Sequence, residues 1–240
     1  MKKKKKISRT RKRIKKIFWT VVIVFFVLTV IPVCLYKFIP VKYTPLMVIR
    51  HFEYKSSPKK IVTKKQWVFI GDISINLQLA AIAAEDDQFI EHSGFDFDAI
   101  QKAYKLNKKR SRKIRGGSTI SQQTAKNVFL WPGRSWIRKG LELYFTVLIE
   151  GIWGKERIME VYLNVVELGY GIYGAEAASQ FYFDKPASDL NKAEAAALVS
   201  ILPNPRKFSM KKPSPYIQRY RNAIVRRMEK MEKVIWTEER

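Results

Sequence analysis

The longest uninterrupted apolar run of the chain lies close to its N-terminus. Residues 17–36 contain no charged side chain, and only Thr20 and Thr29 among them are clearly polar. Twenty residues in a helix span roughly 30 Å, which is the thickness of the hydrocarbon core of a bilayer. A helix buried in a protein core rarely stays apolar on every face over such a length. The pattern therefore predicts a transmembrane helix over residues 17–36.

A cleaved signal peptide is the main alternative for this run. Signal peptides usually carry an apolar region of about 7–15 residues, followed by small residues at the cleavage site. Here the run is longer, and Lys37 and Phe38 follow it. The position of Cys34 is faintly similar to that in a lipoprotein cleavage site, but Val33 is too large to precede such a cysteine. We therefore favour an uncleaved anchor.

The flanking charges predict the orientation of this anchor. Residues 1–16 carry eleven basic side chains and no acidic one. Basic flanks of transmembrane helices stay on the cytoplasmic side. We therefore expect a cytoplasmic tail over 1–16, a single pass through the cytoplasmic (inner) membrane, and an extracytoplasmic location for the rest of the chain.

The pattern changes twice beyond the anchor. Residues 37–66 combine several prolines and lysines without a clear period, and we interpret them as a linker with a short strand around 44–51. Residues 67–240 form the predicted domain, in which strand-like runs are few, so we expect a mainly α fold. The expected helices are 75–84, 97–109, 138–153, 156–166 and 193–202, with a last amphipathic helix that presents Ile217, Tyr220, Ile224, Met228 and Met231 on one face.

Composition limits the class of protein and its partners. Hydrophobic residues make up 47% of the 240 residues, which excludes global disorder. One cysteine and two histidines argue against a disulfide scaffold and a structural zinc site. The formal net charge is +25, and most of it lies outside the basic tail. Because nucleic acid is scarce outside the cytoplasmic membrane, we expect membrane lipids or a phosphate-bearing substrate as anionic partners, and no nucleic acid.

Three segments carry candidate chemistry, and each has a plain structural alternative. Glu85 directly follows an apolar helix, so it can emerge at the edge of a cleft with the raised pKa of a general base. Residues 115–127 combine two glycines with hydroxyl and amide side chains, which suit sugars and phosphates. Arg138 and Glu142 lie four residues apart. The alternatives are a solvated helix end, a capped helix start and a surface ion pair, and spacing alone favours them.

These three segments, followed by residues 155–164 and 194–205, resemble in this order the motifs of the peptidoglycan glycosyltransferases of family 51. The resemblance covers about residues 67–215, and residues 121–136 are most similar to the monofunctional proteobacterial type. It implies a lysozyme-like lobe and a smaller membrane-associated jaw lobe between Glu85 and Glu142. It also implies polymerisation of lipid II into glycan strands, by inverting transfer with release of undecaprenyl pyrophosphate. Five motifs in order are a specific signal, and they reverse the structural alternatives.

The resemblance also implies roles for individual residues. Glu85 matches the general base, and Glu142 matches a second essential glutamate that either positions cations or holds a divalent metal ion, Mg²⁺ or Mn²⁺. No organic cofactor is expected. The implied partners are lipid II, the growing lipid-linked glycan, membrane lipids, and other proteins of wall synthesis or division. The implied substrate-binding residues are Lys102, Ser118, Thr119, Gln122, Gln123, Lys126, Asn127, Arg134, Arg138 and Lys139.

Two short motifs and His92 have plain structural explanations, and two alternative functions stay open. Residues 169–174 fit a G-x-G-x-x-G pattern, but without a strand–helix–strand context we expect only a tight turn. Residues 57–60 fit an S-x-x-K pattern, and we expect no penicillin-binding domain from it because no K-T-G follows. His92 has no partner His or Cys, which favours a structural hydrogen bond. The rival functions are a lytic enzyme that cleaves glycan and a non-catalytic scaffold of wall synthesis.

Overall fold

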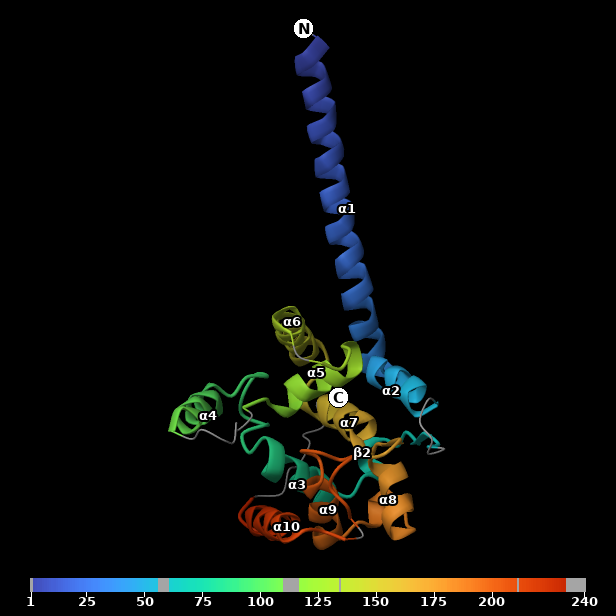
Figure 1. The fold of residues 1–240 in the computed structure, drawn as a ribbon, viewed down its shortest axis with the longest axis vertical. Coiled ribbons are helices and arrows are strands. Elements are labelled where there is room, and N and C mark those ends of the chain that lie inside the picture. The colour runs from blue at the N-terminus through green and yellow to red at the C-terminus, as the bar shows by residue number, and fades with distance from the viewer. Residues whose placement is uncertain (1, 56–60, 110–116, 134, 211, 232–240) are drawn as a thin grey trace. The chain divides into compact units, whose positions relative to one another are not determined.

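A computed structural model describes residues 2–55, 61–109, 117–133, 135–210 and 212–231, and this part of the chain is mainly helical, as predicted (Figure 1). The chain divides into two compact units, residues 1–39 and residues 40–240. The division of the larger unit into a lysozyme-like lobe and a jaw stays a prediction.

The first unit is one long helix, α1 (Lys2–Phe38). Its segment Arg11–Phe38 is long and apolar enough to cross a membrane. Large apolar side chains such as Ile17, Val21 and Leu28 are exposed along it. The predicted apolar run therefore lies within a helix that extends beyond it at both ends.

The second unit begins with a helix where a linker was expected. Helix α2 (Pro45–Lys55) occupies the region of the predicted strand, so that prediction is wrong. Pro45 has the fixed φ angle suited to the first helical position, and the Thr44 hydroxyl oxygen accepts a hydrogen bond from the Met47 N–H at 3.2 Å. Met47 and Tyr54, seven residues apart, are buried on one face of the helix.

Helix α2 is fastened to the rest of the unit by a buried polar pair. The Tyr54 hydroxyl donates a hydrogen bond to Oε1 of Glu167 at 2.7 Å. Burial and this hydrogen bond raise the pKa of Tyr54 to about 12. Burial also raises the pKa of Glu167. Residues 45–55 of the predicted linker therefore pack into the second unit.

A small three-stranded sheet follows the order β1-β3-β2, with β1 (Lys64–Lys65) parallel to β3 (Ile172–Tyr173) and β2 (Glu167–Gly169) antiparallel to it. The glycine pattern of 169–174 is the turn between β2 and β3, as predicted. Gly171 has φ +70°, and a Cβ there would lie 2.9 Å from a side-chain atom of Ile61 and 3.1 Å from the Val62 carbonyl oxygen. The glycine thus permits a close approach of two chain segments.

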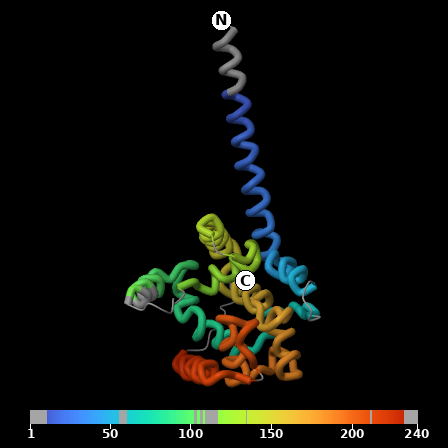
Figure 2. The backbone as a smooth tube through the Cα atoms, in the orientation of Figure 1, coloured from blue at the N-terminus to red at the C-terminus, as the bar shows by residue number. Residues whose placement is uncertain are grey.

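Two groups of helices form the core (Figure 2). Helix α3 (Ile75–Glu85) packs against α9 (Lys192–Ser200) and α10 (Pro215–Met228), while α5 (Ile120–Phe129) packs against α6 (Trp136–Ile152) and α7 (Lys155–Val165). The remaining elements are α4 (Phe97–Lys109), α8 (Ala175–Phe183) and the 3-10 turns η1 (Ile70–Asp72) and η2 (Ala187–Asp189). The helices predicted for the second unit are present with boundaries that agree within a few residues, whereas α2, α5 and α8 were not among them.

Helix α10 also reaches the last turn of α3. One guanidinium nitrogen of Arg227 donates a hydrogen bond to the Ala83 carbonyl oxygen at 3.0 Å, and the Tyr220 hydroxyl donates to the Ala84 carbonyl oxygen at 3.4 Å. The last carbonyl groups of a helix have no partner within the helix itself. Helix α10 therefore supplies donors to the turn that ends in Glu85.

The fourth sequence motif has a structural role. Oε2 of Glu160 accepts a hydrogen bond from the Ile70 N–H at 2.9 Å. The side-chain amide of Asn164 accepts from the Val68 N–H at 3.0 Å and donates to the Val68 carbonyl oxygen at 2.8 Å. These bonds satisfy the backbone of an irregular segment that enters α3.

Candidate active site

Glu85 ends helix α3, and its side chain is only partly accessible to solvent. The side-chain amide of Gln123, on α5, donates a hydrogen bond to Oε2 of Glu85 at 2.9 Å. Burial raises the pKa of Glu85, while the hydrogen bond from Gln123 and the positive charge of Lys126 act in the opposite direction. A raised pKa makes this carboxylate a better proton acceptor than an exposed glutamate.

Asp86, the residue after Glu85, connects the end of α3 to the start of α5. Oδ2 of Asp86 accepts a hydrogen bond from the Ile120 N–H at 2.9 Å, and its other oxygen lies 2.8 Å from Nε2 of His92. Nδ1 of His92 accepts a hydrogen bond from the Gly94 N–H at 3.0 Å, so Nε2 carries the proton and donates to Asp86. The expected structural role of His92 is confirmed. Our sequence analysis missed Asp86, although its position directly after Glu85 was a visible signal.

The start of α5 is held by a capping box. The Thr119 hydroxyl oxygen accepts a hydrogen bond from the Gln122 N–H at 3.2 Å, and Oε1 of Gln122 accepts one from the Thr119 N–H at 3.0 Å. The Thr119 hydroxyl also donates to the Gly94 carbonyl oxygen at 2.7 Å. Both side chains thus position α5, and a direct role for them in substrate binding stays a prediction.

Four charged side chains, those of Glu85, Arg138, Lys139 and Glu142, interact electrostatically with Lys126 on α5. Burial lowers the pKa of Lys126; Glu142 opposes this effect, and the positive charges of Arg138 and Lys139 add to it. Lys126 thus interacts electrostatically with both acids, Glu85 and Glu142. We call Glu85, Gln123, Lys126, Arg138, Lys139 and Glu142 the carboxylate–cation cluster.

Glu142 is buried rather than part of a surface ion pair. Its side chain is 4% exposed, and its Oε1 lies 2.6 Å from Nζ of Lys139. Oε1 of Glu142 thus contacts Lys139, three residues earlier, whereas the sequence alternative paired Glu142 with Arg138. Among the described residues, no hydrogen-bond partner is found for the buried Nε of Arg138. This Nε is a buried donor that the described residues leave unpaired.

The other predicted substrate-binding residues fall into two groups. Ser118 and Asn127 are partly buried at the two ends of the α5 segment. Ser118 also lines a cavity of about 630 Å³ beside Lys139. Lys102 is on α4, but its side chain lies outside the described residues, as does the whole of Arg134. For all of them, substrate binding stays a prediction.

The surroundings of Glu142 do not form a metal cage on their own. Its nearest charged neighbours are cations, and the described part of the chain contains no group of three His, Cys, Asp or Glu side chains able to hold a metal ion. A divalent ion at this place would need most of its ligands from the substrate. The expectation of Mg²⁺ or Mn²⁺ at Glu142 stays a prediction.

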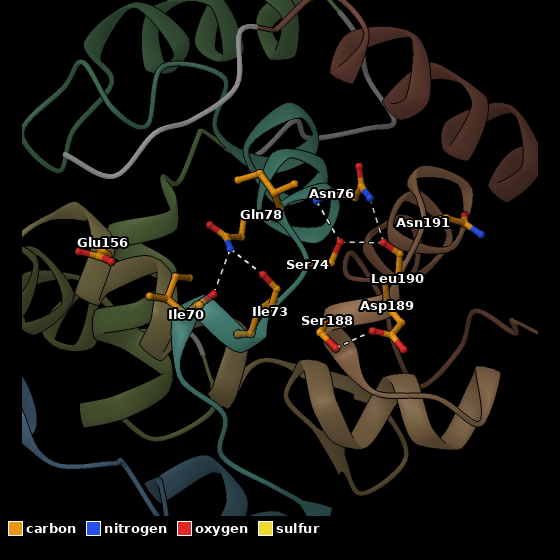
Figure 3. Close-up of a pocket in the computed structure, with 12 residues that line it drawn as sticks. Ile70, Ile73, Ser74, Asn76, Gln78, Glu156, Ser188, Asp189, Leu190 and Asn191 are labelled. Atoms are coloured by element: carbon orange, nitrogen blue, oxygen red, sulfur yellow. Dashed lines mark hydrogen bonds between the residues drawn. The ribbon is translucent and has the colours of Figure 1, made fainter. Parts of the chain in front are cut away.

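A second cavity, of about 700 Å³, lies at the other end of α3 (Figure 3). There the Ser74 hydroxyl donates a hydrogen bond to the Leu190 carbonyl oxygen at 2.7 Å, and the Asn76 amide donates to the same oxygen at 3.0 Å. The Gln78 amide donates to the carbonyl oxygens of Ile70 and Ile73 (Figure 3). These bonds join the start of α3 to its neighbours. No residue of the carboxylate–cation cluster lines this cavity.

Comparison with known proteins gives the family of the chain. The family model described as transglycosylase matches residues 55–229. The biosynthetic peptidoglycan transglycosylase of Bdellovibrio bacteriovorus is 54% identical over 207 residues, which cover 86% of this chain and 82% of the relative. The proteins of the same name from Bacteroides thetaiotaomicron and Caulobacter vibrioides are 51% and 57% identical, covering 90% and 78% of this chain and 87% and 79% of the relatives. The chain therefore belongs to the transglycosylase family.

Proposed function

We propose that this chain is a monofunctional peptidoglycan glycosyltransferase that polymerises lipid II into glycan strands during cell-wall synthesis. Family membership and the names of its relatives support this activity. The single observation that carries the chemistry is the partly buried carboxylate of Glu85, which interacts with half-buried Lys126, while Lys126 in turn interacts with the cations Arg138 and Lys139.

In the proposed reaction, the 4-hydroxyl of the acceptor sugar attacks C1 of the lipid-linked donor. Glu85 takes the hydroxyl proton as the new C–O bond forms. The bond between C1 and the pyrophosphate oxygen breaks, its electron pair leaves with undecaprenyl pyrophosphate, and the configuration at C1 is inverted. General-base catalysis of this kind contributes about 10²–10⁴-fold to a rate.

The cations of the cluster suit the leaving group. A pyrophosphate is a weak base, so its departure requires stabilisation of negative charge rather than a strong acid. Lys126, Arg138 and Lys139 supply positive charge, and Glu142 holds Lys139 in place through the 2.6 Å contact. A lytic enzyme needs a protonated acid and no pyrophosphate site, so this arrangement and the biosynthetic relatives disfavour that alternative.

We further propose that α1 spans the cytoplasmic membrane with the N-terminus inside and the catalytic unit outside. The length and composition of Arg11–Phe38 and the basic residues before it support this topology. Such an anchor keeps the enzyme at the surface where a lipid-linked substrate lies, which raises its effective concentration.

The test is the turnover of labelled lipid II by the parent protein and by Glu85→Gln. The substitution keeps the shape but removes the proton acceptor, so polymerisation should fall by at least about 10²-fold. Glu91→Gln, which changes an exposed acid a short distance along the chain, is the matched control and should retain activity. A Glu85→Gln protein that polymerises within a few-fold of the parent would refute the general-base role. Cleavage of finished glycan by the parent would favour the lytic alternative.

A further inference from the structure

Helix α2 has an outer face whose side chains are exposed. Val48, His51, Phe52 and Lys55 recur at the spacing of one helix face, and all four are exposed. The side chains of Val48 and Phe52 are large apolar groups with exposed fractions of 46% and 63%. We call these four residues the outer face of α2.

Buried contacts on the opposite side of α2 keep the outer face turned away from the core of its unit. Met47 and Tyr54 are buried, and the Tyr54 hydroxyl is bonded to Glu167. Helix α2 also packs against α5. Because these contacts hold the helix, Val48 and Phe52 cannot turn inward without breaking a buried hydrogen bond.

The chain itself ties this face to the end of α1. Only residues 39–44 separate α1 from α2, and even a fully extended connection of this length spans at most about 25 Å. The connection is not a polar spacer, since Ile39 and Tyr43 are exposed apolar or aromatic side chains. Aromatic side chains with a polar tip favour the membrane–water interface.

Positive charges at both ends of α2 indicate what kind of surface its outer face contacts. Lys42 precedes the helix, Lys55 ends it, and both are exposed. A helix with apolar and basic side chains on its outward face suits a surface of acidic headgroups over acyl chains. A short tether to an apolar helix, exposed apolar side chains and flanking lysines all favour a lipid surface.

We propose that the outer face of α2 lies on the outer leaflet of the membrane and contacts lipids with acidic headgroups. The inference rests on the membrane-spanning part of the proposed function and not on the transfer reaction. It makes α2 a second, surface-bound contact that limits how the catalytic unit can tilt relative to the bilayer.

The test uses the full-length protein in vesicles that contain phosphatidylglycerol and lipids carrying a quencher in their acyl chains. An environment-sensitive fluorophore is attached in turn to the native Cys34 in α1, to Phe52→Cys, and to Ser188→Cys, an exposed position near the second cavity. The last two are made in a Cys34→Ser background, so each protein carries one label. Cys34 reports the anchor, Ser188→Cys reports water, and Phe52→Cys tests the inference.

We expect severalfold stronger quenching at Phe52→Cys than at Ser188→Cys, with a blue-shifted emission that weakens when phosphatidylglycerol is replaced by a zwitterionic lipid. Quenching at Cys34 with none at Phe52→Cys would overturn the inference while the anchor stands. The absence of quenching at both would overturn the anchor and the inference together. Shielding of Phe52→Cys that depends on protein concentration and not on the lipid would assign the face to a second copy of the chain, and would also overturn it.

Discussion

Replacing Gln123 by methionine should shift the acidic limb of the pH–rate profile to higher pH. The Gln123 amide donates the 2.9 Å hydrogen bond to Oε2 of Glu85, and this bond favours the ionised carboxylate. Methionine has a similar volume but no donor, so the pKa of Glu85, already raised by burial, should rise further. The base must be ionised to accept a proton. Activity should therefore be lost at a higher pH than in the parent as the pH falls.

The size of this effect follows from the kind of bond that is removed. A hydrogen bond to a charged group contributes about 1.5–3 kcal/mol, and about 1.4 kcal/mol corresponds to a factor of ten in an ionisation equilibrium. On the acidic limb, turnover by Gln123→Met should thus be roughly 10- to 150-fold below that of the parent. On the alkaline plateau, where Glu85 is ionised in both proteins, the difference should largely disappear.

The neighbouring glutamine is the matched control. Gln122 belongs to the capping box with Thr119 and does not contact Glu85 through any hydrogen bond described for it. Gln122→Met should cost about 1 kcal/mol of stability, as loss of a helix cap does, and leave the acidic limb in place. Turnover of lipid II is measured in detergent over a range of pH for all three proteins. The role assigned to this hydrogen bond would be refuted if the parent and Gln123→Met lost activity at the same acidic pH. It would also be refuted if Gln122→Met shifted the acidic limb of the pH–rate profile as far as Gln123→Met does.

Three further predictions concern the cluster, the anchor and the fold. Glu142→Gln removes the partner of Lys139 and should lower turnover by at least about tenfold, without rescue by added divalent ion; normal turnover would reduce the pair to a structural contact. Removal of residues 1–39 should preserve some turnover in detergent but end tight, salt-resistant retention on membranes, and salt extraction of the full chain would contradict an integral anchor. Tyr54→Phe leaves the buried Glu167 without its donor and should lower the free energy of unfolding by about 1–3 kcal/mol at unchanged turnover; an unaltered melting curve would argue against the fastening of α2.

Sequence patterns predicted the elements with strong local signals. The apolar run that became α3 and the spaced apolar positions of α10, of which Ile217, Ile224 and Met228 are buried, were predicted correctly. Helix α2 was missed because only Met47 and Tyr54 are buried in it, and two positions do not define a period. Strand β1 consists of two lysines and forms through backbone pairing with β3. No side-chain pattern predicts such a pairing.

The features of the candidate site also divide into those with a local sequence signal and those without one. A local feature, an acid that directly follows an apolar helix, made Glu85 a candidate, and the family resemblance then implied its role as the base. Its bond to Gln123 joins residues 38 positions apart, and spacing carries no information about such a contact. For Glu142, neighbours three and four positions away both lie on the same helix face, so spacing could not choose between Lys139 and Arg138. Burial of the carboxylate, which depends on packing against other helices, decides the environment of that pair.

The contact between α10 and the last turn of α3 has a consequence for biosynthesis. The donors that reach the carbonyl oxygens of Ala83 and Ala84 lie 144 and 136 residues later in the chain. A ribosome therefore completes Glu85 long before it makes the side chains that support its turn. With the topology proposed above, the catalytic unit lacks this support until residue 227 has crossed the membrane. Catalytic competence should thus arise at the end of translocation, so that partly exported chains stay inactive.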